Sequence, residues 1–183
     1  VLGEGAAALV IESEESAKRR GAKVYAVLCG YGSSSDASHM TLPNREGQIR
    51  AMREALSESA LPFDAVGYVN AHGTATLAGD VTEAESLREA FGRHVDCLAV
   101  SSTKSMHGHL IGAAGAVEFA ISVLALHTGS IPPTAHLDDP DPLCDLDHVA
   151  KVARHGKPLL AVMSNSFAFG GSNVSLMACQ PDQ

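Results

Sequence analysis

The chain has 183 residues, of which 45% are hydrophobic, and its mean hydropathy of +0.07 is typical of one well-buried globular core. Its formal net charge of −8 argues against nucleic acid or an anionic membrane surface as the main partner, because both attract concentrated positive charge. We find no apolar run of the ~18 residues that a membrane span needs, so no membrane segment is expected.

The four cysteines are widely spaced and form no C-x-x-C pair. Such spacing predicts neither a zinc site nor a disulfide framework, and a reducing cytoplasm is the expected compartment. The chain opens on Val1 within a glycine-bearing stretch, so we expect it to be a piece of a longer protein.

The first elements predicted along the chain are two strands with a short helix between them. Gly3 and Gly5 lead into an apolar run at residues 6–11, which is typical of a strand in a covered sheet. Ser13 can cap the helix, because acidic residues follow it and basic residues end the segment. Residues 23–29 predict the second strand, and a glycine- and serine-rich loop is expected after it.

The next segment predicts two helices with a strand between them. Asn44 can cap an amphipathic helix, since apolar residues recur after it at helical spacing. Residues 66–71 have the apolar pattern of a buried strand. Asp80 and Glu83 offer carboxylates to cap a helix at residues 81–91.

A strand, a polar turn and a buried helix follow. Residues 98–100 are apolar, residues 101–108 are rich in hydroxyl groups, and residues 112–125 are small and apolar. Because strands alternate with helices of about 10 to 15 residues, the sequence predicts an α/β fold with a largely parallel sheet. Two last strand-like runs, residues 159–164 and 173–179, predict an antiparallel hairpin.

Histidines follow two of these predicted strands. His72 comes directly after residues 66–71, and His107 and His109 come shortly after residues 98–100. Ligands bind preferentially at the carboxyl ends of strands in α/β sheets, so we expect both segments to meet at one pocket. For His72 considered alone, a hydrogen-bonded structural histidine at a strand end is the simpler explanation.

The histidines and the lysine between them allow two further interpretations, a metal site and a buried ion pair. The H-x-H spacing suits a pair of metal ligands, so a metal hydrolase that uses His72, His107 and His109 is one alternative. Such a site needs more ligands, and Lys104 would repel a cation, so no metal is expected. A buried lysine is costly unless it is paired, and Glu118 and Glu83 are its candidate partners.

Three long motifs occur in order along the chain. They are Asn70-Ala71-His72-Gly73-Thr74-Ala75-Thr76 with Gly79-Asp80, Ser102-Thr103-Lys104-Ser105 with Gly108-His109-Leu110, and Asn165-Ser166-Phe167-Ala168-Phe169-Gly170-Gly171-Ser172-Asn173. Together they resemble the motifs of β-ketoacyl-acyl carrier protein synthases, the type II fatty acid condensing enzymes. The resemblance implies a thiolase-like fold with layers α-β-α-β-α, in which residues 1–22 end the N-terminal half and residues 23–183 form the C-terminal half.

The resemblance also implies roles for individual side chains. The implied catalytic residues are His72, His109 and Lys104, the lysine orienting His109. The implied substrate-binding residues are Thr74 and Thr76 on the pantetheine arm, Phe169 as a gate to the acyl tunnel, and Thr41 near the entrance. Glu118 and Glu83 are implied as the partners of Lys104 in a supporting ion pair. Two positions depart from the family pattern: His107, where a small hydroxyl residue is usual, and Ala168, where glycine is usual.

The reaction implied is a decarboxylative Claisen condensation between a cysteine-bound acyl thioester and a malonyl group. The implied partner is acyl carrier protein with phosphopantetheine-linked acyl and malonyl groups, in a homodimer that needs no cofactor. No cysteine here lies in a glycine-flanked strand-to-helix turn, so we expect the nucleophile in the absent half and this chain alone to be inactive. A polyketide ketosynthase and a non-catalytic carrier-protein-binding partner, similar to chain-length factors, are the alternatives.

Overall fold

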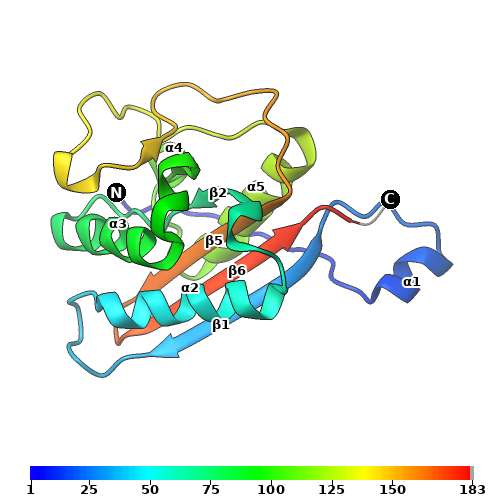
Figure 1. Cartoon of the computed structure of the whole chain (residues 1–183), viewed down its shortest axis with the longest axis horizontal. Coiled ribbons are helices and arrows are strands. Elements are labelled where there is room, and N and C mark those ends of the chain that lie inside the picture. The colour runs from blue at the N-terminus through cyan, green and yellow to red at the C-terminus, as the bar shows by residue number, and fades with distance from the viewer. Residues whose placement is uncertain (182–183) are drawn as a thin grey trace.

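A computed structural model describes residues 1–181, and its elements are arranged as in Figure 1. In chain order they are α1 (Glu14–Arg19), β1 (Val27–Ser35), α2 (Arg45–Ser59), η1 (Phe63–Ala65), β2 (Val66–Asn70), α3 (Leu77–Phe91), η2 (Gly92–Cys97), β3 (Ala99–Ser101), α4 (Lys104–His107), η3 (Ile111–Ala113), α5 (Ala114–Thr128), η4 (Pro142–Cys144), β4 (Asp147–His148), β5 (Ala161–Ala168) and β6 (Ser172–Cys179).

The strands form one six-stranded sheet in the order β1-β6-β5-β2-β3-β4. The pairs β5-β2, β2-β3 and β3-β4 are parallel, whereas β6 runs antiparallel to both β5 and β1. The predicted largely parallel sheet and the predicted C-terminal hairpin are therefore confirmed.

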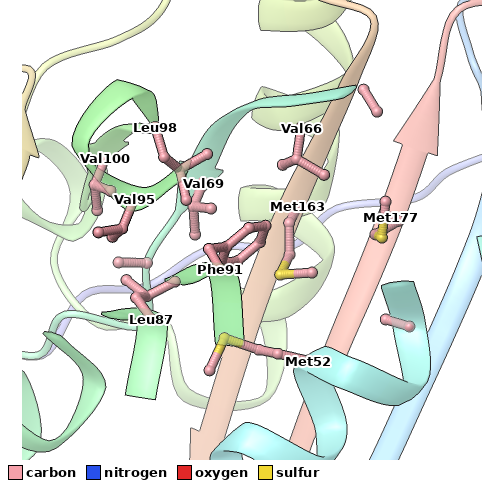
Figure 2. Packing of buried hydrophobic residues seen from close by; sticks show 13 residues of the cluster. Met52, Val66, Val69, Leu87, Phe91, Val95, Leu98, Val100, Met163 and Met177 are labelled. Atoms are coloured by element: carbon pink, nitrogen blue, oxygen red, sulfur yellow. The ribbon is translucent and has the colours of Figure 1, made fainter. Parts of the chain in front are cut away.

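One face of the sheet is covered by α2 and α3. Met163 of β5 and Met177 of β6 pack there with Met52 of α2 and with Leu87 and Phe91 of α3, as Figure 2 shows. Side chains alternate along a strand, so the neighbouring residues of the same strands point to the opposite face.

The opposite face is covered by α5, which lies across β5 in Figure 1. Val162 and Ala178, the strand neighbours of the two methionines, pack there with Phe119 and Leu126 of α5. Tyr68 of β2 is also fully buried on this side. A sheet that is buried on both faces explains why the strand segments read as continuous apolar runs.

The helix α5 bears on the expectation that the chain has no apolar run as long as a membrane span. The helical stretch Ile111–Thr128 is long and apolar enough to cross a membrane, judged by length and composition alone. Its Ile, Val, Leu and Ala residues give it this character, and its one carboxylate, Glu118, is fully buried beside Lys104. The expectation that no stretch of such length exists was therefore wrong.

Two predicted helix caps are confirmed. The hydroxyl of Ser13 accepts a hydrogen bond from the amide of Ser16 at the start of α1, over 3.2 Å. The side-chain oxygen of Asn44 accepts one from the amide of Gly47 at the start of α2, over 2.9 Å. Each bond satisfies an amide that the first helical turn leaves without a partner.

The strand β1 runs further than expected, through the segment predicted to be a loop. Gly30 and Gly32 lie within it, directly under α2. A Cβ atom on Gly32 would lie 1.9 Å from the carbonyl oxygen of Ala51, so the glycines allow close packing of the strand on the helix. Their role is close approach, not a turn, and the sequence pattern alone does not distinguish the two.

The strand predicted at residues 6–11 is absent. This segment is mostly exposed, and no strand of the described chain (1–181) pairs with it, although Leu9 packs on the buried cluster under α5. Leu2 instead forms an isolated parallel bridge with His109, far along the chain.

Candidate active site

The carboxyl ends of β2 and β3 lie side by side, because the two strands pair in parallel with Asn70 opposite Ser101. The amide of Ala71 donates to the carbonyl of Ser101 over 2.9 Å and extends this pairing past β2. His72 and His109 follow the two ends, and their rings meet edge to face with 5.5 Å between centroids. The structure thus brings both histidine segments together.

The imidazole of His72 lies in an apolar, positively charged environment. The ring of Phe167 packs on it with 6.0 Å between centroids. Burial lowers the pKa of His72 from its ordinary value of 6.5 to about 3, and the charge of Lys104 acts in the same direction. The ring is therefore neutral at physiological pH and has one N–H donor.

Glu83 fixes the backbone at His72. Its Oε1 accepts from the amide of His72 and its Oε2 accepts from the amide of Gly73, each over 2.9 Å, and Asn165 Nδ2 also donates to Oε1. Burial raises the pKa of Glu83, and the two backbone hydrogen bonds oppose that shift. Both predictions for Glu83 were wrong: it neither caps α3 nor forms an ion pair with Lys104, because its two oxygens hold the end of β2.

The predicted carboxylate cap at Asp80 is also wrong. The helix α3 begins at Leu77 with Thr76 in the N-cap position, so Asp80 lies inside its first turn. Burial raises the pKa of Asp80, and in the part of the chain that the structure describes its Oδ1 has no hydrogen-bond partner.

Lys104 and Glu118 form a buried ion pair. Lys104 Nζ lies 2.5 Å from Glu118 Oε1, and the two side chains are only 5% and 1% exposed. Burial raises the pKa of Glu118, and the charge of Lys104 opposes the shift. Among residues 1–181, neither the ammonium nor the two carboxylate oxygens have a further hydrogen-bond partner, so each charge depends on the other.

The imidazole of His109 is oriented by its own loop. The amide of Ile111 donates to His109 Nδ1 over 3.3 Å, which leaves Nε2 as the protonated nitrogen of the neutral ring. Burial and the charge of Lys104 lower the pKa of His109. His109 therefore presents an N–H donor from Nε2.

His107 does not join the other two histidines. Its Nε2 lies 3.2 Å from Thr103 Oγ1 and its Nδ1 lies 2.7 Å from the carbonyl oxygen of Gly108. Within residues 1–181, no three His, Cys, Asp or Glu side chains come together in a way that could hold a metal ion. The described residues therefore contain no set of metal ligands that would support the metal-hydrolase hypothesis.

A cavity of about 760 Å³ opens beside the histidine pair. Five residues assigned to the site from the sequence are among its lining residues: Thr74, Thr76, Glu83, Lys104 and His109. Its apolar wall comes from α3 and from the segment before β4, for example Leu87 and Leu146. A mostly apolar cavity with a few convergent polar groups is typical of a small-molecule site.

Phe169 and Thr41 lie outside the lining of this cavity. Phe169 is 78% exposed on the turn between β5 and β6, and Thr41 is exposed on the loop between β1 and α2. The amide of Gly170 donates to the carbonyl of Met40 over 2.8 Å, so the turn and the loop contact each other.

Three residues near the histidines were not assigned to the site from the sequence. Asn165 donates to Glu83, Phe167 packs on His72, and the hydroxyl of Ser102 donates to the carbonyl of Gly73 over 2.8 Å. All three lie inside the quoted motifs, which is the signal that could have found them.

Cys144 was also missed as a cavity residue. Burial raises the pKa of its thiol, and nearby carboxylates including Asp80 act in the same direction. A thiol with a raised pKa is a poor nucleophile at neutral pH. Cys144 is therefore no substitute for an activated catalytic cysteine.

The mixed sheet with helices on both faces is the thiolase-like fold of ketosynthases, one of which superimposes on the whole chain. The family model described as "Beta-ketoacyl synthase, C-terminal domain" matches residues 25–138. The chain therefore belongs to the β-ketoacyl synthase family.

Two kinds of known protein are similar to the chain. It is 51% identical over 179 residues to 3-oxoacyl-[acyl-carrier-protein] synthase 2 of Coxiella burnetii (strain RSA 493 / Nine Mile phase I), covering 97% of this chain and 43% of that protein. The ishigamide ketosynthase/chain length factor structure superimposes with a TM-score of 0.95 at 40% identity, covering 100% of this chain and 44% of that chain.

A third relative is a complex. This structure is a type II polyketide synthase acyl carrier protein in complex with its ketosynthase. One chain of the complex matches with a TM-score of 0.89 at 32% identity, over 93% of this chain and 42% of the matched chain. The chain thus spans less than half the length of the relatives that it matches.

Proposed function

We propose that the chain is the C-terminal part of a 3-oxoacyl-[acyl-carrier-protein] synthase, an acyltransferase that catalyses decarboxylative Claisen condensation in fatty acid biosynthesis. The observation that carries the proposal is the pair of neutral imidazoles, His72 and His109, facing each other beside the buried Lys104–Glu118 pair. The 51% identity to a synthase of this name supports it.

In the proposed reaction, the bond between the malonyl carboxylate and Cα breaks and carbon dioxide leaves. The electron pair forms an enolate whose negative charge lies largely on the thioester oxygen. Neutral N–H donors of His72 and His109 are proposed to bind this oxygen and to assist loss of the carboxylate, and such preorganised donors are worth about 3 to 4 kcal/mol each. The enolate carbon then attacks the acyl thioester, and the cysteine thiolate leaves.

Lys104 is proposed to act through the histidines and not on the substrate. Burial lowers the pKa of both His72 and His109, and the charge of Lys104 adds to this shift, which favours the neutral, donating form of each ring. Glu118 lies 2.5 Å from the ammonium and compensates its charge inside the protein.

The remaining assignments concern the substrate. Thr74 and Thr76 line the cavity with hydroxyls 3.3 Å apart, which suits a role in binding the amides of the pantetheine arm. Phe169 and Thr41 are proposed to control entry from outside the cavity, a role that agrees with their exposed positions on two loops that touch.

The proposed partner is acyl carrier protein, which the name of the Coxiella relative contains and which the polyketide complex includes. We assign residues 1–22 to the end of the N-terminal half and residues 23–183 to the C-terminal half of the whole synthase. The nucleophilic cysteine is assigned to the N-terminal half, and the whole protein is proposed to be a cytoplasmic homodimer. Four free cysteines agree with a reducing compartment.

A polyketide ketosynthase is the second candidate, favoured by the TM-score of 0.89 to the ketosynthase of a type II polyketide synthase. Both candidates use the same decarboxylation and differ in the acyl chain. A non-catalytic partner would bind acyl carrier protein without releasing carbon dioxide.

The test is release of carbon dioxide from malonyl-acyl carrier protein by the whole synthase and by its His109→Ala variant. We expect the variant to lose about 100-fold to 1,000-fold in rate. His107→Ala is the matched control, because His107 binds Thr103 and Gly108 instead of facing His72. Equal release by all three proteins would contradict the proposed role of His109, and no release by any of them would favour the non-catalytic partner.

A further inference from the structure

The first three residues of the chain are joined by backbone hydrogen bonds to the loop that carries His109. The amide of His109 donates to the carbonyl of Val1 over 2.9 Å, and the amide of Gly3 donates to the carbonyl of His109 over 3.0 Å. Both backbone groups of His109 are therefore engaged by one segment, and Leu2 lies opposite it as a parallel bridge.

The pairing depends on the absence of a side chain at Gly3. A Cβ atom there would lie 2.2 Å from the carbonyl oxygen of His107, which belongs to the backbone and cannot rotate away. Gly108 faces it with φ +73°, and a Cβ on Gly108 would lie 3.0 Å from the amide nitrogen of Gly3. The two glycines thus let the two backbones approach within van der Waals contact.

Gly5, two residues on, provides a contrast. A Cβ atom on Gly5 would meet only the end of the Leu110 side chain, at 3.0 Å, and that methyl group can move. A side chain is thus excluded by rigid backbone at Gly3 and opposed only by a flexible group at Gly5.

We propose that Gly3 is a positioning residue for His109: it lets residues 1–3 pair with residues 107–109 and so holds the imidazole against His72. The inference rests on the proposed condensation, in which His109 must donate to the developing enolate oxygen. A displacement of about 1 Å at a reacting group can reduce a rate about 100-fold, so a side chain at Gly3 should affect chemistry more than binding.

The experiment compares Gly3→Ala and Gly5→Ala in the whole synthase. For Gly3→Ala we expect kcat for decarboxylation of malonyl-acyl carrier protein to fall about 100-fold, with KM and the transfer of an acyl group to the cysteine nearly unchanged. Acyl transfer forms no enolate, so it reports on the integrity of the rest of the site. Gly5→Ala should decarboxylate at a rate within about 2-fold of the parent.

Amide hydrogen exchange gives a readout that is independent of activity. The amide of His109 should be protected in the unmodified synthase and should exchange at least about 10-fold faster in Gly3→Ala. Rapid exchange in the unmodified protein would overturn the inference even if Gly3→Ala failed to fold. Full decarboxylation by Gly3→Ala, or equal loss of acyl transfer and decarboxylation, would overturn it as well.

The two proposals can fail separately. If the unmodified synthase released no carbon dioxide, the proposed function would be wrong. Even then, a His109 amide that is protected in the unmodified protein and in Gly5→Ala but not in Gly3→Ala would support the positioning of the loop by Gly3. A His109 amide that is unprotected in the unmodified protein would overturn the positioning of the loop.

Discussion

The ring of His72 lies edge to face against the ring of His109, with 86° between their planes. Burial lowers the pKa of both histidines, the charge of Lys104 adds to this shift, and two imidazolium ions at this separation would repel each other. The relationship therefore keeps two uncharged N–H donors at one end of the cavity. Its first consequence is a dependence of stability on pH.

The free energy of unfolding should fall as the pH decreases from 6.5 toward 3. In this range the unfolded chain binds a proton at His72 that the folded chain does not, because folding lowers the pKa to about 3. This residue should contribute a slope of about 1.4 kcal/mol per pH unit. Denaturant unfolding of the parent and of His72→Asn at several pH values measures the difference, and equal slopes would contradict the lowered pKa.

Breaking the Lys104–Glu118 pair should be more costly than removing it. Lys104→Met leaves a buried carboxylate without a partner and should cost about 3 to 5 kcal/mol, whereas Lys104→Met combined with Glu118→Met should cost less. The exposed pair Lys151–Asp138 is the control, since Lys151→Met should cost at most about 1 kcal/mol. Chemical denaturation of the four proteins gives the comparison, and a double variant less stable than Lys104→Met would rule out this account.

Removing the acceptors at Glu83 should destabilise the end of β2. Glu83→Gln replaces one acceptor oxygen with a donor and should leave one amide, of His72 or Gly73, unsatisfied, at a cost of about 1 to 3 kcal/mol. Glu85→Gln, on the exposed side of the same helix, should change stability by less than about 0.5 kcal/mol. Urea unfolding with amide exchange at residues 72 and 73 tests this, and similar effects of the two variants would contradict the assigned role.

Two adjacent glycines in the β5–β6 turn should respond differently to alanine. Gly170 and Gly171 have φ values of +81° and +79°, so Ala at either position carries a backbone penalty of about 1 to 2 kcal/mol. Only Gly171 adds a clash, because its Cβ atom would lie 1.8 Å from the carbonyl oxygen of Asp36. Thermal unfolding should show a clearly larger loss for Gly171→Ala, and equal losses would argue against the close approach.

The sequence by itself predicted the features that depend on neighbouring residues. Ser13 and Asn44 cap their helices because a side-chain oxygen reaches an amide three residues ahead. The C-terminal hairpin and the strand before His72 follow from runs of apolar residues that suit a sheet buried on both faces. His72 and His109 were also predicted to meet, since parallel strands end at one edge of a sheet.

The tertiary structure decided whatever depends on residues distant in the chain. Glu83 holds the amides of His72 and Gly73 instead of capping its helix, and His107 turns away from the other two histidines. Gly3 binds the His109 loop with its backbone alone, so no side-chain pattern marks it. Local propensity acts over a few residues. The partners of the Glu83 carboxylate, the His107 imidazole and the Gly3 backbone are instead set by which groups the folded chain buries and packs beside them.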